Sequence, residues 1–211
     1  MDRPFLLHTD AHCVIVDKPA GLPAVPGRPL ALHDCAHSRA CAVHADARVV
    51  HRLDMATSGL LLFARGQDAQ RALSRAFEQR QVRKRYVALV DGQLNSPDGE
   101  IRLPIGAHWP DRPRRRVDPE AGQAALTRYR VLAAEGGRSL VELEPVTGRT
   151  HQLRVHLQAI GHPILGDALY APPPVQAAAP RLMLHASVLA FPHPGTGEIV
   201  EIRSAPGFDL P

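Results

Sequence analysis

Runs and alternations of apolar residues predict a chain built mainly of strands. Continuous apolar runs predict buried strands at 12–17 and 60–63, and the segment 84–90 is apolar on both faces beyond its tyrosine, as in a central strand. Apolar and acidic residues alternate at 139–145, which is typical of a half-solvated strand. The segment 48–54, RVVHRLD, is also expected to be a strand, ending at its carboxylate.

Two segments have a helical period instead. Between Asp68 and Arg80 apolar residues recur at helical spacing, so we expect an amphipathic helix. In the segment TGRTHQLRVHLQAIGHP, the residues Leu153, Leu157 and Ile160 share one stripe, and the Gly and Pro that follow end the helix. The last segment, 181–204, reads as strands joined by a Gly-containing turn. Many strands with few helices predict an α+β fold, with a mixed, mostly antiparallel β-sheet core and flanking helices.

The length limits the number of domains, and the cysteines suggest a reducing compartment. The 211 residues suffice for one large domain or two small ones, and they contain no internal repeat or long linker. No apolar run approaches the roughly 20 residues that span a bilayer, and the first residues do not resemble a signal peptide. The three cysteines form no C-x-x-C pair and are odd in number, which argues against a disulfide framework. We therefore expect a cytoplasmic protein that does not enter membranes.

The basic residues favour a polyanionic partner. The net charge is +4, and only Lys18 and Lys84 among the 25 basic residues are lysine. Arginine suits bidentate contacts with phosphates and base edges, although a GC-rich genome would explain the same bias.

Asp54 is the first candidate for chemistry, because it stands where a strand gives way to the turn that precedes Gly59. The structural alternative is an aspartate that only bonds its own turn. Arg154 lies off the apolar stripe of its helix and could face a cleft; it could also be an ordinary solvated arginine. A neighbouring arginine would keep the carboxylate ionised, as a nucleophile, a base or an electrostatic stabiliser, but the sequence leaves open whether the two meet.

Four segments resemble, in order and spacing, the signature segments of the RluA-type pseudouridine synthases. They are HRLDMATSGLLLFA, KRYVALVDG, PVTGRTHQLRVHLQAIGHPILGD and RLMLHA. The early segment VIVDKPAGLPAVPGR resembles that family's opening strand and loop, so the likeness covers nearly the whole chain. HWPDRPRRR resembles an insertion found in the short form of these enzymes. The resemblance implies the pseudouridine synthase catalytic fold, as a single catalytic domain spanning 1–211 without the appended RNA-binding domain of longer relatives. It also implies an RNA uridine-to-pseudouridine isomerase that needs no cofactor and no metal.

The same resemblance implies roles for five residues. Asp54 would be the essential catalyst, whether it attacks the sugar, attacks the ring or removes a sugar proton, and Arg154 would form a salt bridge to it. Tyr86 would stack on the target uracil and is a candidate for moving the C5 proton. Leu184 would form an apolar wall of the pocket, and Arg52 would hold the flipped nucleotide or fill its place. Without the resemblance, Tyr86 could be a plain strand aromatic and Leu184 simply core.

A dense arginine run follows Trp109. Arg112, Arg114 and Arg115 belong to this run and are expected to bind the substrate RNA, because an arginine cluster beside an aromatic suits phosphate and base contacts. The alternative is a solvated surface loop. The resemblance favours a structured RNA partner, a tRNA anticodon stem-loop, a 23S rRNA stem-loop or both. We expect a monomer, because the sequence has no coiled-coil or obvious interface pattern.

A cluster of Cys and His residues suggests a different chemistry. It consists of His33, Cys35, His37, Cys41 and His44. Their spacing matches no standard zinc finger, so we expect them on a helix or loop surface without a functional metal. The leading hypothesis is thus an RNA pseudouridine synthase. The second is a non-catalytic RNA-binding protein of the same fold, but the joint presence of Asp54, Tyr86 and Arg154 argues against it. The third is a metal-dependent hydrolase that uses the Cys and His cluster.

Overall fold

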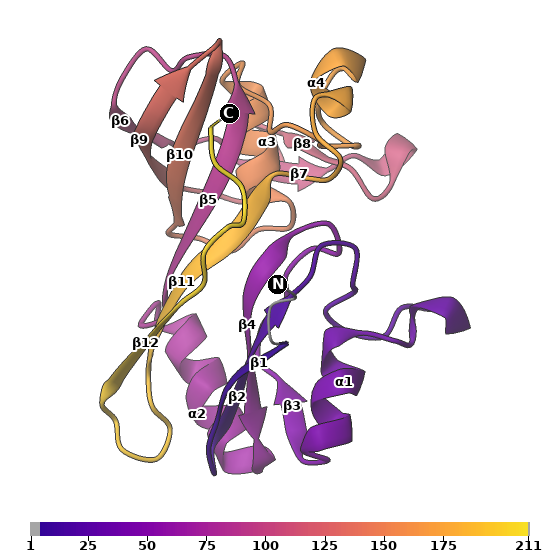
Figure 1. The fold of residues 1–211 in the computed structure, drawn as a ribbon, viewed down its shortest axis with the longest axis vertical. Helices are drawn as coiled ribbons and strands as arrows, with labels where there is room; N and C mark the ends of the chain where they lie inside the picture. The colour runs from indigo at the N-terminus through magenta and orange to yellow at the C-terminus, as the bar shows by residue number, and fades with distance from the viewer. Residues whose placement is uncertain (1–4, 211) are drawn as a thin grey trace. The chain divides into compact units, whose positions relative to one another are not determined.

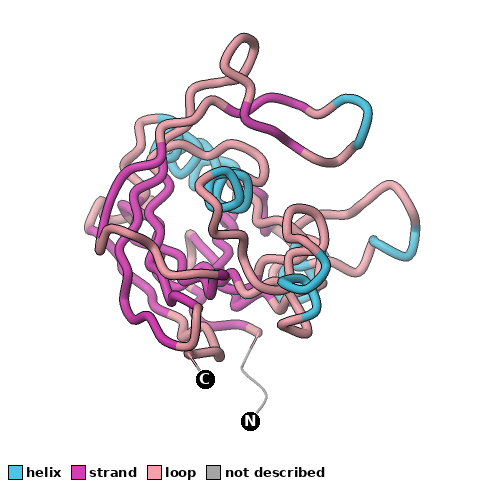
Figure 2. Tube along the Cα trace, turned by 90° about the horizontal axis from the view of Figure 1, so that it is seen from above, coloured by secondary structure: helices cyan, strands magenta, loops and turns pink. Residues whose placement is uncertain are grey.

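Strands account for most of the regular structure in residues 5–210, the part of the chain that this computed structural model describes (Figures 1 and 2). The chain divides into two compact units. The first contains the residues up to Lys84 together with His185–Pro206, and the second contains Arg85–Leu184 together with the residues from Gly207. Because strands dominate and helices are few and short, the fold is α+β, as the sequence predicts.

The sheet of the first unit is antiparallel except at one pairing. Its strands lie in the order β1 (Leu6–Thr9), β2 (Cys13–Lys18), β4 (Ser58–Arg65) and β11 (Leu184–Pro192). β3 (Ala47–Val49) also pairs with β4, and β12 (Ile199–Arg203) pairs with β11. Only β4 and β11 run parallel to each other. The unit also contains η1 (Leu30–Leu32), α1 (Ala36–Val43) and α2 (Gly66–Glu78).

The core of this unit forms where α2 covers the sheet. Seven consecutive residues of β4, from Ser58 to Ala64, are buried, which confirms the buried strand that the apolar run predicts. The apolar stripe of α2 is buried with residues of β2, β4 and β11, including Ile15, Leu62 and Phe191. The predicted helix is thus confirmed, and its stripe faces the core because helical spacing places those residues on one side.

Gly59 allows β4 and β11 to approach each other. It has a φ of 110°, and a Cβ atom there would lie 2.3 Å from the carbonyl oxygen of Ala186. Only glycine tolerates both the backbone conformation and this distance. The TSG sequence therefore fixes the start of β4 just after the turn that contains Asp54.

The strand predicted at 48–54 is wrong beyond Val49. β3 pairs with β4 only through Ala47–Val49, and the chain from 50 to 57 is irregular. The reason is a side chain that takes the place of the ladder: the backbone N–H of Leu62 donates to Nε2 of His51 at 3.0 Å. The segment around Asp54 is consequently free to form a turn.

The second unit has an antiparallel sheet in the order β5 (Arg83–Asp91), β10 (Arg138–Pro145), β9 (Thr127–Glu135) and β6 (Asp98–Ile101). A separate hairpin consists of β7 (Ile105–Ala107) and β8 (Arg115–Val117), joined through η2 (Trp109–Asp111), as Figure 2 shows. The helices are α3 (Gln152–Ala159) and α4 (Pro173–Ala177). The strands predicted at 84–90 and 139–145 are confirmed.

The first six residues of α3 are buried on all sides of the helix, which corrects the single apolar stripe expected from the sequence. Residues Gln152 to Leu157 are all buried, and Ile160 lies at the C-cap rather than inside the helix. Its polar side chains are tolerated because each has a partner. For example, the ring of His156 bonds Oγ1 of Thr127 and the carbonyl oxygen of Leu103, each at 2.9 Å.

Two further expectations can be compared with the structure. All three cysteines are free, in agreement with the prediction from their number and spacing. Among residues 5–210, no helix combines the length and the apolar character that crossing a bilayer would require.

Candidate active site

Asp54 lies in the irregular segment between β3 and β4, in a turn closed by its own backbone. The N–H of Thr57 donates to the carbonyl oxygen of Asp54 at 3.1 Å, and the aspartate is partly buried. Leu53 is buried and Arg52 is exposed, so neighbouring residues point in opposite directions. The guanidinium of Arg52 is therefore accessible to a ligand at the mouth of this turn.

A buried lysine holds the residue after Asp54. The side chain of Lys18, at the end of β2, is fully buried, and its ammonium donates to the carbonyl oxygens of Pro19, Leu22 and Met55 at 2.8–3.0 Å. The N–H of Gly21 donates to the same Met55 oxygen at 2.9 Å. These bonds replace the ladder bonds that the segment around Asp54 lacks, and so they fix the turn.

The electrostatics of Lys18 also depend on Asp54. Burial lowers the pKa of Lys18 to about 8, and the negative charge of Asp54 acts in the opposite direction by favouring the ammonium. Sequence reasoning did not select Lys18 as a functional residue. The available signal was a rare lysine in an arginine-rich chain, placed directly after an apolar strand, where a compact ammonium can satisfy several carbonyls that a planar guanidinium would not fit.

A buried polar chain lies beside Gly59 in the same unit. Oγ of Ser204 donates to Asp17 at 2.7 Å, so Nε2 of His185 donates to Ser204 at 3.1 Å. Nδ1 of His185 is then the acceptor for the hydroxyl of Ser58, 2.9 Å away. This chain of hydrogen bonds joins β2, β4 and β11.

In the second unit, Arg154 is almost fully buried and forms a bidentate pair with Asp167. Its Nε and Nη2 donate to the two carboxylate oxygens of Asp167 at 2.8 and 2.6 Å, and only 4% and 1% of the two side chains are exposed. The N–H groups of Leu169 and Tyr170 donate to the same carboxylate. Asp167 was missed from the sequence, although its place after a glycine in HPILGD marks a turn where an aspartate can collect backbone N–H groups.

Tyr170 connects Arg154 to the arginine-rich hairpin. Its ring lies against the guanidinium of Arg154, 5.0 Å from the ring centre. Its hydroxyl accepts the N–H of Arg115 at 2.9 Å and bonds Nδ1 of His151 at 2.6 Å. The first residue of β8 and the start of α3 are thereby tied to one side chain. Tyr86 is partly buried on β5, where it pairs with Leu143 of β10.

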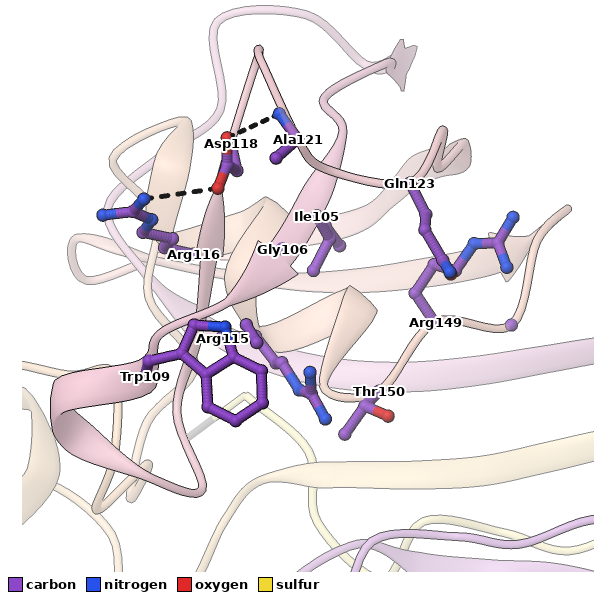
Figure 3. Close-up of a pocket in the computed structure, with 12 residues that line it drawn as sticks. Ile105, Gly106, Trp109, Arg115, Arg116, Asp118, Ala121, Gln123, Arg149 and Thr150 are labelled. Carbon is purple, nitrogen blue, oxygen red and sulfur yellow. Dashed lines mark hydrogen bonds and ion pairs between the residues drawn. The ribbon is translucent and has the colours of Figure 1, made fainter.

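The hairpin and the segment before α3 line a cavity of about 670 Å³ (Figure 3). Arg115, Arg116 and Arg149 are among its lining residues, together with Trp109 and Thr150. Arg116 is paired with Asp118, and Arg149 donates to the carbonyl oxygen of Ala124. Nε of Arg115 is different, because it is buried and, within the described part of the chain, has no hydrogen-bond partner. Figure 3 shows the Arg115 side chain between Trp109 and Thr150, so this pocket offers an unused donor to an anion.

The other two predicted arginines lie around the exposed Trp109. The guanidinium of Arg112 covers the indole ring at 4.0 Å from its centre, and 68% of Trp109 is exposed. Arg114 pairs with Asp111 at 3.0 Å. Neither of them lines the cavity, so of the three predicted arginines only Arg115 does.

The remaining predicted residues are Leu184 and the Cys and His cluster. Leu184 is buried at the start of β11. Cys35 is the N-cap of α1, where its Sγ accepts the N–H of Ser38, and Cys41 contacts His37 on the same helix. Within residues 5–210 the Cys and His cluster of the sequence does not gather three potential metal ligands. Its residues lie on and around one helix. The expected surface position is wrong for Cys35, which is fully buried because its side chain caps α1.

Comparisons with known proteins identify the family. Residues 12–159 match the family model of RNA pseudouridylate synthases. The "Dual-specificity RNA pseudouridine synthase RluA" of Pasteurella multocida is 47% identical over 96% of this chain and 93% of its own length. The protein of the same name from Escherichia coli K12 is 44% identical over the same shares.

A solved structure agrees with this relationship. Human RNA Pseudouridylate Synthase Domain Containing 1 superposes with a TM-score of 0.79 at 30% identity, covering 95% of this chain and 82% of that one. Sequence and fold point to the same enzymes. The chain thus belongs to the RluA family of pseudouridine synthases, isomerases that modify RNA.

Proposed function

We propose that Asp54 is the catalytic carboxylate of this RNA pseudouridine synthase. The observation that carries the proposal is its setting: an aspartate in the family segment HRLD, in a turn whose next carbonyl is held by the buried ammonium of Lys18. A rigid turn keeps a carboxylate in position for a substrate that must be brought to it.

Pseudouridine formation requires a correctly positioned carboxylate and no redox partner. The bond between uracil N1 and the sugar C1′ breaks, and a bond from C5 to the same C1′ forms. The proton leaves C5 and N1 takes one up, so atoms and electrons balance without a redox partner. Asp54 acts on the sugar or the ring while this exchange occurs.

We assign the neighbouring roles from the family segments. Arg154 pairs with Asp54, and Tyr86 stacks on the flipped uracil. Asp54 belongs to the first unit and the other two to the second, so these pairings rest on the family resemblance. Arg52 holds the extruded nucleotide, and Leu184 forms an apolar wall. Flipping a base costs a few kcal/mol, and stacking on an aromatic ring returns about 1–3 kcal/mol of it.

We propose that the cavity lined by Arg115, Arg116 and Arg149, called the arginine pocket below, and the exposed Trp109 bind the RNA around the target uridine. Arg115 offers an unpaired donor to a phosphate, while Arg112 and Arg114 add positive charge beside a ring on which a base can stack. The substrates we expect are the tRNA anticodon stem-loop and a 23S rRNA stem-loop. The dual-specificity relatives, which match over 96% of this chain, support this choice.

The test is pseudouridine mapping on the two transcribed stem-loops, each incubated with the wild-type enzyme. A loop uridine should be converted in both RNAs, and replacing it by cytidine should abolish the signal. Conversion of one RNA alone would contradict dual specificity. Conversion of neither, by an enzyme that binds both, would contradict the proposed substrates.

A further inference from the structure

A cluster of potential metal ligands lies at the turn between β1 and β2, in the first unit. One oxygen of Asp10, Oδ1, accepts the N–H groups of His12 and Cys13 at 2.7 and 2.9 Å. This arrangement fixes the carboxylate and leaves its second oxygen, Oδ2, for side chains. Nε2 of His8 lies 2.9 Å from Oδ2, and Sγ of Cys13 lies 3.5 Å from it. The three ligand atoms of His8, Asp10 and Cys13 all lie within 4.8 Å of one another.

These distances are close to those around a tetrahedral zinc ion. Zinc binds N, O and S ligands at about 2.0–2.3 Å, which places neighbouring ligand atoms about 3.2–3.7 Å apart. The side chain of His8 is partly exposed and can rotate, whereas Cys13 is fully buried and fixed. A thiol, an imidazole and a carboxylate together form a donor set that suits zinc better than magnesium or calcium.

His193 supports the carboxylate without joining the ligands. Its Nδ1 accepts the N–H groups of Gly195 and Thr196, each at 3.2 Å. The ring proton of the neutral histidine is therefore on Nε2, which donates to Oδ2 of Asp10 at 3.1 Å. An outer hydrogen bond of this kind orients a carboxylate ligand.

We propose that the β1–β2 turn binds one zinc ion through Nε2 of His8, Oδ2 of Asp10 and Sγ of Cys13. Water completes the coordination. The zinc ion replaces the thiol proton of Cys13, which passes to solvent, and the histidine ligand is neutral. The site uses none of the residues assigned to pseudouridine formation.

Two features of the cluster oppose binding and limit its strength. Burial raises the pKa of the Cys13 thiol to about 12, with the charge of Asp10 adding to the effect, so the metal has to displace a firmly held proton. The guanidinium of Arg65 donates to the carbonyl oxygen of Asp10 at 2.7 Å and places a positive charge nearby. Three ligands beside that charge favour a modest affinity rather than an obligatory structural ion.

The experiment titrates metal-free enzyme with Co²⁺, whose thiolate complexes absorb in the near ultraviolet, and then with Zn²⁺ as competitor. The variants are His8→Gln and Cys13→Ala, with Cys41→Ser as the control because that thiol also contacts a histidine but belongs to α1. We expect one equivalent of Co²⁺, a thiolate band in the wild type and in Cys41→Ser, and at least about tenfold weaker binding in His8→Gln. Cys13→Ala should lack the band.

Other outcomes would overturn the site. No stoichiometric binding by the wild type, or a band that survives His8→Gln at full affinity, would contradict the ligand set. A band lost only in Cys41→Ser would assign the thiolate to α1 instead. If Cys13→Ala does not fold, His8→Gln decides alone, since its partly exposed ring can be replaced without opening the core.

Discussion

Two buried charged residues support the side chains proposed for catalysis, one in each unit. Lys18 donates to three carbonyl oxygens, one of them that of Met55, the residue after Asp54, and Asp167 pairs with Arg154. A buried charge is tolerated only with such partners, and removing one partner costs far more than the pair contributes. Each support can therefore be tested by a single substitution.

Replacing Lys18 by methionine should reduce both stability and activity. The carbonyl oxygens of Pro19 and Leu22 would lose the donor that Lys18 provides, and the oxygen of Met55 would keep only the N–H of Gly21. We therefore expect a loss of about 2 kcal/mol in the free energy of unfolding. Pseudouridine formation should fall as the turn at Asp54 loosens. Urea denaturation and single-turnover assays measure the two effects. Lys84→Met is the matched control, because Lys84 is also buried enough to have a lowered pKa. Its contact with the ring of Phe77 and its charge effect on His51 do not involve the carbonyl oxygens that Lys18 bonds. Equal losses in both variants would contradict the special role of Lys18.

Asp167→Asn should leave the guanidinium of Arg154 with an uncompensated buried charge. We expect destabilisation of about 3 kcal/mol, since breaking a buried pair typically costs about 3–5 kcal/mol and asparagine keeps part of the hydrogen bonding. The control is Asp68→Asn, which breaks an exposed pair with Arg71 on α2 and should not change stability measurably. Thermal unfolding of the two variants compares them directly. A stable Asp167→Asn enzyme would mean that the pair contributes little.

At the scale of elements, hydrophobic periodicity predicts a helix or strand correctly where burial of its apolar residues alone decides the structure. This holds for four elements, because each buries the apolar residues of a simple pattern: β4, β5, β10 and α2. The pattern failed at β3, where a histidine ring replaces the ladder, and at α3, whose polar residues are buried with partners from distant segments. Such partners are set by the tertiary structure, and for the same reason Lys18 and Asp167 were not identified from the sequence.

His51 makes the stability of the protein depend on pH, because its ring takes the place of a strand partner for the N–H of Leu62. The ring accepts a backbone N–H and stacks on Phe77 at 4.7 Å, and burial lowers its pKa to about 3, with the charge of Lys84 adding to the effect. Below the ordinary histidine pKa of about 6.5 the unfolded chain takes up a proton that the folded protein refuses, so stability falls as the pH drops from about 6.5 towards 3. Above that range this histidine contributes no pH dependence.

His51→Gln should flatten this part of the profile. The amide oxygen can still accept the N–H of Leu62, but it does not titrate. We expect the difference in the free energy of unfolding between wild type and variant to change by at most about 1.4 kcal/mol per pH unit below pH 6.5. Above pH 6.5 this difference should not change. Denaturant unfolding at a series of pH values measures this difference. A parallel pair of profiles would show that His51 is not held neutral.

At the scale of the whole molecule, RNA binding should depend on salt and on the arginine pocket. Arg115→Gln removes the unpaired donor and is expected to weaken binding of a stem-loop several-fold and to reduce the salt slope by about one unit. Arg71→Gln, on the exposed surface of α2, serves as the control and should change neither. Filter binding at several salt concentrations provides both quantities. A Kd that is insensitive to salt, or equal effects of the two substitutions, would contradict the proposed RNA surface.

The role of Asp54 is the central claim, and the most direct test is single-turnover pseudouridine formation by Asp54→Asn on a stem-loop that the wild type modifies, with the Kd of that RNA measured alongside. The substitution keeps the size of the side chain and removes its charge. The account predicts that pseudouridine formation falls by at least about a thousandfold, as expected when a reacting group is removed, while the RNA is still bound. A variant that binds the RNA and keeps more than about a tenth of the wild-type rate would contradict the account, because another group would then have to perform the reaction.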